Sequence, residues 1–269
     1  SKPMMALFIY PLWIFFARTI DRLGKGIRTG AGDAILSDEA TPSTKGKIFG
    51  FHRSMDTLGA VLGPSLALWY LYCYPNAYQS LFYIAFIPGC IAILATFLLK
   101  DKNRKVAPVK KRIPFFSFLS YWKTSPAHYK KLMVGLLAFT LFNSSDIFLL
   151  LKAKQSGISD SMVIFLYIFY NLVYALASYP LGIIADKISL KKMFVSGLLI
   201  FALVYFCMGL SNNFYVIGGI FLLYGIYAAA TEGISKAWIS NITAKKDTAT
   251  AIGTYAGFQS ICTMIASSV

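Results

Sequence analysis

The sequence IFFARTIDRLGKGIRTGAGD, residues 14–33, decides how the rest of the chain is interpreted. It lies in a long, otherwise apolar helical pattern. At about 100° per residue, its first five charged side chains fall within an arc of about 120°. A charge at membrane depth costs about 3 kcal/mol on insertion scales, so such residues usually face a bundle interior or a water-filled path. The five are Arg18, Asp21, Arg22, Lys25 and Arg28.

A second charged helix is predicted from residues 51–64, FHRSMDTLGAVLGP. His52 and Asp56 share one helical face with Gly59 and Gly63, and Asp56 is one turn from Arg53. One interpretation is that these charges only neutralise one another and lock two helices together. The other is that they bind a solute or a proton. Cations outnumber anions across the two helices, which favours a functional role for the set.

The composition is that of a membrane protein. The 269 residues are 57% hydrophobic and only 14% charged, with a mean hydropathy of +0.61. Soluble domains are about a quarter charged, and several apolar runs here reach the roughly 20 residues that cross a bilayer. We therefore expect an all-α, polytopic membrane protein. The four cysteines are isolated and there are only two histidines, so neither a disulfide framework nor a metal site is expected.

Eight membrane spans and three regions are predicted. Residues 1–99 form the end of an N-terminal helical half, 100–131 a basic linker, and 132–269 a C-terminal half. Phe115, Phe118, Leu119 and Trp122 repeat at helical spacing, which predicts an interfacial helix in the linker; an unstructured linker is the alternative. The spans are 14–38, 47–71, 79–99, 132–151, 161–185, 193–211, 214–240 and 249–269.

Basic residues predict the orientation of these spans. Alternation places four connections on one side, and this side holds most Lys and Arg outside the spans. The other side has only Lys2, Lys152 and Lys154. By the positive-inside rule, the basic side is cytoplasmic, so the net charge of +15 reflects topology and not nucleic-acid binding. The four cytoplasmic connections lie near 39–46, 100–131, 186–192 and 241–248.

The two halves show traces of an internal repeat. When the sequence is shifted by 203 residues, Gly30 aligns with Gly233 and Ser37 with Ser240. Asp56 then aligns with Gln259. The matches align span with span and loop with loop, a pattern typical of transporters built from repeats.

At this point the sequence resembles the major facilitator superfamily. The run Gly182-Ile-Ile-Ala-Asp186-Lys187-Ile-Ser-Leu-Lys191-Lys192 is similar to its loop motif G-x-x-x-D-[RK]-x-G-x-[RK]-[RK], with Ser189 at the second glycine position. Arg18, followed by Gly24 and Gly26, resembles the fourth-helix motif. Gly59 to Pro64 resembles the fifth-helix motif G-x-x-x-G-P of proton-coupled exporters, without its closing Gly-Gly pair.

The resemblance implies a fold of twelve helices in two halves of six. The chain would correspond to about helices 4 to 11. It would be part of a multi-pass protein of the bacterial inner membrane, in an uncharacterised branch of the superfamily, that acts as a monomer. The implied activity is secondary active transport of a small organic solute by alternating access, proton-coupled and with export slightly favoured. No cofactor is expected.

Candidate roles follow from residue chemistry and from the resemblance. Proton coupling is assigned to Asp56, His52 and Asp21, because a carboxylate in a low-dielectric site responds strongly to a nearby cation. The excess of arginine and lysine in the two charged helices suggests that the solute is an anion. Glu232 and Lys236, four residues apart, are expected to pair, and Asp146 is expected to be solvated. The substrate-binding candidates are Arg28, Lys25, Arg53, Asn143, Asn171 and Glu232. The gating or structural candidates are Arg18, Gly59, Gly63, Pro64, Gly182, Asp186, Lys187, Lys191 and Lys192.

A membrane enzyme is the competing interpretation. Asp21, Asp33 and Asp38 would chelate Mg²⁺ for lipid phosphotransfer near the cytoplasmic face. Their spacing does not place all three on one helical face, and the neighbouring cations would compete with the metal. We therefore expect a transporter and not an enzyme.

Overall fold

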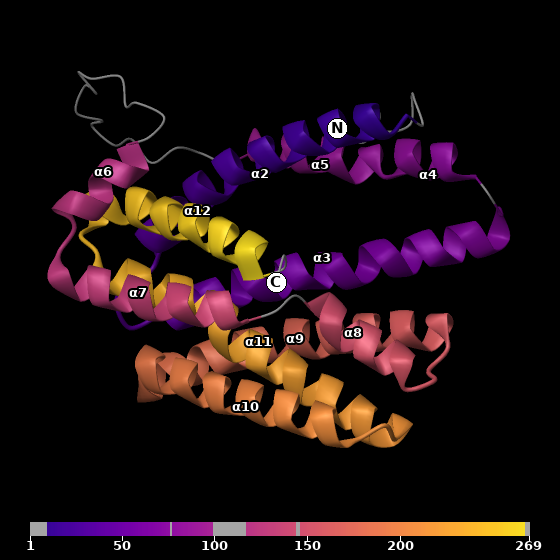
Figure 1. Ribbon diagram of the computed structural model, residues 1–269. Helices are drawn as coiled ribbons and strands as arrows, with labels where there is room; N and C mark the ends of the chain where they lie inside the picture. The colour runs from indigo at the N-terminus through magenta and orange to yellow at the C-terminus, as the bar shows by residue number, and fades with distance from the viewer. Residues whose placement is uncertain (1–9, 76, 99–116, 144–145, 267–269) are drawn as a thin grey trace. The chain divides into compact units, whose positions relative to one another are not determined.

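The computed structural model describes residues 10–75, 77–98, 117–143 and 146–266, and all regular structure in them is helical (Figure 1). The predicted all-α fold is confirmed for this part of the chain. The helices are α2 (Pro11–Glu39), α3 (Lys45–Cys73), α4 (Tyr78–Ile84), α5 (Phe86–Thr96), α6 (Ser117–Thr124), α7 (Ala127–Phe142), α8 (Asp146–Gln155), α9 (Asp160–Ile188), α10 (Leu190–Leu210), α11 (Phe214–Ile242), η1 (Lys245–Asp247) and α12 (Thr248–Ala266).

Five helical stretches are long and apolar enough to cross a membrane: α4 with α5, α7 with α8, α9, α10 and α11. The long helices α2, α3 and α12 are not among them. Charges lower the hydropathy of α2 and α3, and α12 contains four threonines, two glycines and a glutamine. Polar content of this kind is compatible with a helix that faces a polar interior.

Two spans predicted as continuous are each divided. Pro88 has no N–H group for the Ile84 carbonyl and its ring crowds that carbonyl, so α4 ends at Ile84. The second break follows α7, where Asn143 has an extended backbone with φ −86° and ψ 97°. Its side-chain amide donates to the Tyr227 hydroxyl at 3.0 Å. Asparagine competes for hydrogen bonds in this way and favours helix ends.

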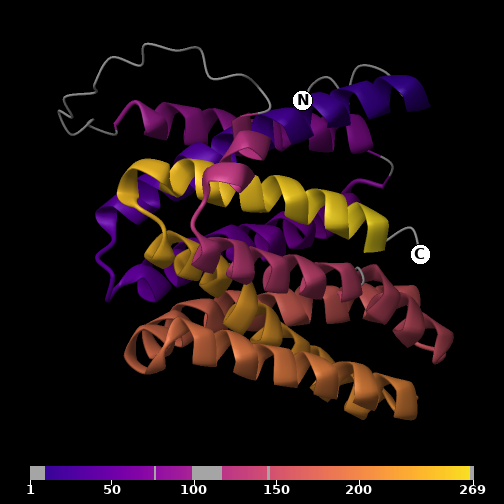
Figure 2. The ribbon, with the colours of Figure 1, turned by 60° about the vertical axis from the view of Figure 1, so that its left-hand side comes forward.

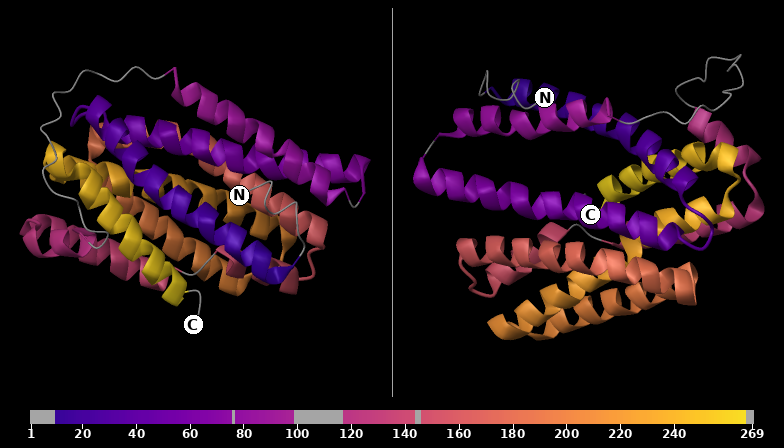
Figure 3. Two further views of the ribbon diagram at one scale, coloured as in Figure 1. Left: turned by 90° about the horizontal axis from the view of Figure 1, so that it is seen from above. Right: turned by 180° about the vertical axis from the view of Figure 1, so that it is seen from behind.

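The contacts divide the chain into two units. The first contains residues 1–29 and 65–117, and the second contains 30–64 and 118–269. Within the second unit, α9, α10 and α11 are neighbours (Figures 1 and 3), and α7 lies beside α12 (Figure 2). The contacts thus group residues 30–64 with the C-terminal half, although the sequence repeat assigns them to the N-terminal half.

The linker helix is present as α6. Tyr121 packs edge-on against Tyr129 of α7, and Trp122 packs against Phe258 of α12. These two side chains therefore contact protein. The interfacial position of α6 stays a prediction, and Phe115 lies outside the described residues.

Glycines allow α3 and α9 to cross closely. A Cβ atom at Gly46 would lie 2.6 Å from the Gly182 carbonyl oxygen, and one at Gly50 would lie 3.2 Å from the Gly182 Cα. Gly182 lies at this close crossing, whereas a Cβ added at Gly59 or Gly63 would meet nothing within 4 Å among the described residues.

Gly182→Ala is expected to destabilise the protein by about 1–3 kcal/mol, because the new methyl group would overlap the Gly46 backbone. Gly59→Ala is the matched control, since its methyl meets open space and alanine favours a helix by about 0.5–1 kcal/mol. The midpoint of thermal unfolding in detergent measures both. Equal shifts in the two variants would contradict the close crossing.

Ser189 links α9 to α10 with a backbone that glycine would adopt more easily. Its φ of 145° is the only positive φ of a non-glycine residue in the described part of the chain. This is the position of the second glycine in the loop motif. The turn therefore forms with serine, at a cost of about 1–3 kcal/mol in backbone strain.

Ser189→Gly is expected to raise the free energy of unfolding by about 1 kcal/mol, because the strain is relieved. Ser196→Gly, the same change inside the helix α10, should instead lower it by about 0.5–1 kcal/mol. Chemical unfolding of the two variants gives the comparison. A Ser189→Gly variant no more stable than the parent would show that the turn is unstrained.

Candidate functional site

Arg53 joins three helices of the second unit. Its Nε donates to the Tyr174 hydroxyl of α9, and its Nη2 donates to Glu232 Oε2 of α11 at 3.0 Å. Its Nη1 donates to Asp56 Oδ2, one turn along α3, at 3.3 Å. The planar fork of arginine suits such multiple contacts. One cation is thus shared by two carboxylates, a set called the Arg53 cluster below.

Asp33 and Lys236 form a second ion pair, from Nζ to Oδ2 at 2.7 Å, and Asp33 is only 1% exposed. The expected pairing of Glu232 with Lys236 is therefore wrong. Each residue instead pairs with a partner from residues 30–64, because packing of α11 against that segment decides the contact. Lys236 thus pairs with Asp33, one of the carboxylates that the phosphotransferase interpretation assigns to Mg²⁺. No group of three metal-ligating side chains is found among the described residues.

The three described connections predicted to be cytoplasmic meet at one end of the second unit. Asp186 accepts hydrogen bonds from the backbone N–H groups of Gly46 and Lys47, each at 2.7 Å, at the start of α3. A carboxylate there also interacts favourably with the helix dipole. Lys45 donates to Ser240 Oγ at 2.7 Å. Burial lowers the pKa of the Lys45 ammonium, Lys245 lowers it further, and Asp38 opposes them.

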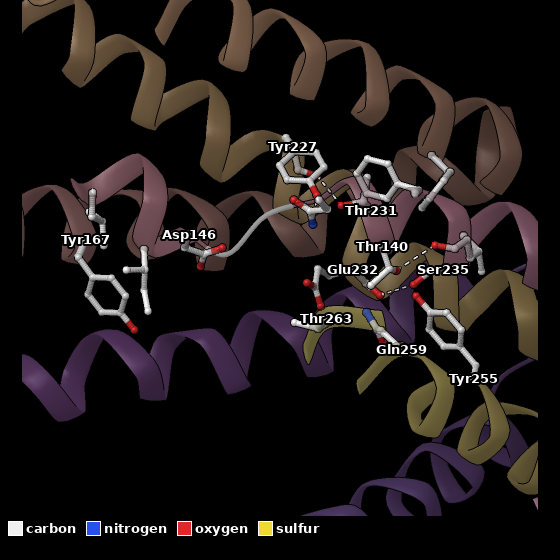
Figure 4. A pocket seen from close by; sticks show the side chains of 16 residues that line it. Thr140, Asp146, Tyr167, Tyr227, Thr231, Glu232, Ser235, Tyr255, Gln259 and Thr263 are labelled. Atoms are coloured by element: carbon white, nitrogen blue, oxygen red, sulfur yellow. Dashed lines mark hydrogen bonds between the residues drawn. The ribbon is translucent and has the colours of Figure 1, made fainter. Parts of the chain in front are cut away.

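A cavity of about 430 Å³ lies beside the Arg53 cluster, lined by Glu232 among others. Figure 4 shows Asp146 and Tyr167 toward one side of it, with Glu232, Gln259 and Tyr255 toward the other. Its wall comes from α7, α8, α9, α10, α11 and α12. The lining residues are Leu136, Phe139, Thr140, Asn143, Asp146, Ile147, Leu150, Tyr167, Phe194, Tyr227, Thr231, Glu232, Ser235, Tyr255, Gln259 and Thr263.

Two tyrosines hold the Asp146 carboxylate by hydrogen bonds. The sequence had predicted that this side chain is only solvated, and that prediction is wrong. Its Oδ2 accepts from the Tyr170 hydroxyl and its Oδ1 from the Tyr224 hydroxyl, each at 2.6 Å. These partners lie on α9 and α11. Tyr167, Tyr170 and Tyr174 repeat at helical spacing on α9, but nothing in the sequence indicated that Tyr170 would contact Asp146.

The structure places the other predicted site residues in different positions. Asn143 and Glu232 line the cavity, whereas the Asn171 amide donates to the Tyr167 carbonyl of its own helix and does not line it. His52 is exposed, as are Asp56, Gly59, Gly63 and the loop lysines Lys187, Lys191 and Lys192. The helix α3 continues through Pro64. The side chains of Arg18, Asp21, Lys25 and Arg28 lie outside the described residues.

Comparison with known proteins identifies the family of this chain. The sequence profile of the Major Facilitator Superfamily matches residues 3–159 and residues 132–269. The chain belongs to the major facilitator superfamily. With its membrane-length apolar helices, this makes it a multi-pass membrane protein.

Three relatives illustrate the similarity of this superfamily member to curated proteins. An uncharacterized MFS-type transporter of Methanocaldococcus jannaschii is 33% identical over 88% of this chain and 59% of its own length. An uncharacterized Mycobacterium bovis protein is 25% identical over 91% of this chain and 60% of its own length. The mouse MFS-type transporter SLC18B1 is 29% identical over 75% of this chain and 43% of its own length. The chain thus spans about three fifths of the first two relatives.

Lys236→Met is expected to destabilise the protein by about 3–5 kcal/mol, because it leaves the buried Asp33 carboxylate without its cation. Adding Asp33→Asn should recover part of this loss. Lys154→Met is the control, since the exposed pair of Lys154 with Asp160 contributes at most about 1 kcal/mol. Unfolding in detergent measures all three. Equal losses for the two lysine variants would refute a buried ion pair at Asp33.

Proposed function

We propose that the protein is a proton-coupled secondary active transporter of a small organic solute and that it works by alternating access. The observation that carries this proposal is the Arg53 cluster, in which one guanidinium holds both Asp56 and Glu232. Superfamily membership supports transport as such. Export is the favoured direction, because residues 59–64 resemble the fifth-helix motif of proton-coupled exporters.

Charge balance explains why this cluster suits a transported proton. With both carboxylates ionised, Arg53, Asp56 and Glu232 together carry one net negative charge. A net charge at membrane depth is costly, and uptake of one proton by either carboxylate removes it. Because Glu232 also lines the cavity, solute binding and protonation act on the same side chain. His52 and Asp21 are proposed as further proton carriers toward Asp56.

The contacts at the end that holds residues 39–46 and 186–192 support alternating access. The bonds from Gly46 and Lys47 to Asp186, and from Lys45 to Ser240, hold that end together. We assign them to a state closed toward the cytoplasm. Opening would break them, with gating by Asp186 and hinging around Gly182. The three loop lysines and Arg18 are proposed to support this motion.

Glu232→Gln is expected to reduce solute-dependent proton movement at least tenfold, because glutamine cannot release a proton. The full-length protein is placed in everted membrane vesicles with a respiration-driven proton gradient, followed by a pH-sensitive dye while solutes are added. Exchange of labelled solute across the membrane without a gradient should persist, since it needs no net proton transfer.

Asp160→Asn is the control for this test, because Asp160 is an exposed carboxylate at the start of α9 and lies away from the cavity. It should behave like the parent in both assays. Unchanged proton movement in Glu232→Gln would overturn coupling through the Arg53 cluster. Loss of exchange as well would assign Glu232 to solute binding.

A further inference from the structure

The described part of the cavity wall contains acidic side chains but no basic ones. Among its sixteen lining residues are two carboxylates, Asp146 and Glu232, and no lysine, arginine or histidine. Glu232 is balanced by Arg53 at 3.0 Å. No cation in the described part of the chain pairs with Asp146, whose two partners are neutral tyrosine hydroxyls. Among the described residues, the unbalanced charge at the cavity is therefore negative and lies on Asp146.

The hydroxyl groups of the wall add hydrogen-bond acceptors. Thr140 donates to the Leu136 carbonyl, Thr231 to the Tyr227 carbonyl and Ser235 to the Glu232 carbonyl, each at 2.9 Å within their own helices. A hydroxyl has one hydrogen and two lone pairs. Once the hydrogen is directed at the backbone, the oxygen can only accept from a ligand.

Asn143 supplies a further acceptor. Its amide nitrogen donates to the Tyr227 hydroxyl, while its carbonyl oxygen Oδ1 is buried and has no hydrogen-bond partner among the described residues. A buried polar atom without a partner is costly, and a ligand donor would relieve that cost. Asp146 also has spare capacity, because a carboxylate offers about four acceptor positions and the tyrosines use two.

Aromatic rings complete the wall. Tyr167, Tyr227, Tyr255, Phe139 and Phe194 line the same cavity. Rings of this kind bury an apolar body and attract a cation over their faces, with about 0.5–2 kcal/mol per contact. A volume of about 430 Å³ is in the range of pockets for small organic molecules.

We propose that this cavity binds an amphipathic organic cation with a protonated amine, the ammonium group at Asp146 and the apolar body against the rings. An ammonium group supplies both the missing positive charge and the N–H donors that the acceptors require. Asp146 and Asn143 are the specificity residues. This assignment rests on the proposed transport function and names its substrate class.

The sequence predicted an anionic solute, which is the alternative to the cation proposed here. That expectation rested on Arg28, Lys25 and Arg53. Of these, Arg53 is already bound to two carboxylates, and the side chains of the other two lie outside the described residues. A carboxylate ligand in the cavity would meet the unbalanced charge of Asp146, which would repel it.

The test uses four probes that share a phenethyl-type body: phenethylammonium, phenethyltrimethylammonium, hydrocinnamate and phenethyl alcohol. Binding to the protein in nanodiscs is measured at neutral pH by titration calorimetry. We expect phenethylammonium to bind most tightly, the trimethyl cation, which has no N–H donor, more weakly, and the anion not at all. Asp146→Asn should weaken binding of phenethylammonium at least tenfold, and Asp160→Asn should leave it unchanged.

Three results would overturn the assignment: tighter binding of hydrocinnamate than of phenethylammonium, equal binding of all four probes, or no binding by protein whose circular dichroism shows it is folded. The circular dichroism spectrum and the unfolding midpoint of Asp146→Asn, compared with those of Asp160→Asn, guard against misfolding of the Asp146 variant. The measurement needs no proton gradient. Failure of proton coupling would therefore leave the assignment of a cationic substrate intact. Proton-driven movement of an anion would refute that assignment, while the proposed transport function would stand.

Discussion

The hydrogen bonds and ion pairs of the Arg53 guanidinium join α3 to α9 and α11 within the second unit. The guanidinium is held by Tyr174 of α9, Glu232 of α11 and Asp56 of its own helix. A buried or half-buried charge pair is weak evidence for stability, since desolvation offsets much of the attraction. In the proposed mechanism, these three partners would hold α3 against α9 and α11 in a way that can be released. Uptake of a single proton would change that charge balance, whereas an apolar contact would not respond.

The internal repeat gives these contacts a common geometry. Asp33 pairs with Lys236, and Ser37 lies 2.6 Å from Ser240 between hydroxyl oxygens; in both pairs the residues are separated by 203 positions. The same shift aligns the two halves of the sequence. Residues that are equivalent in a two-fold repeat touch each other only near its axis, so these two contacts between the ends of α2 and α11 agree with the predicted repeat.

Periodicity predicted most of the helices, because helix formation depends on local spacing. The pair of Arg53 with Asp56, three residues apart, was predictable for the same reason. Glu232 was assigned the wrong partner, since Lys236 is four residues away and Arg53 is 179 residues away. Asp146 was misjudged similarly, with its tyrosines 24 and 78 residues away. Sequence spacing ranks partners within a helix and carries no information on which helices pack together.

The break between α7 and α8 ties the fold to the cavity. Asp146 is the first residue of α8, where the partial positive charge of the helix N-terminus favours a carboxylate. A continuous helix would give Asp146 no such support. Transporters of several folds use interrupted helices to direct helix ends at a solute. Here the helix end favours a negative charge at Asp146, and no cation among the described residues pairs with this side chain. The interruption that the hydropathy pattern missed thus places a carboxylate at a helix N-terminus beside the cavity.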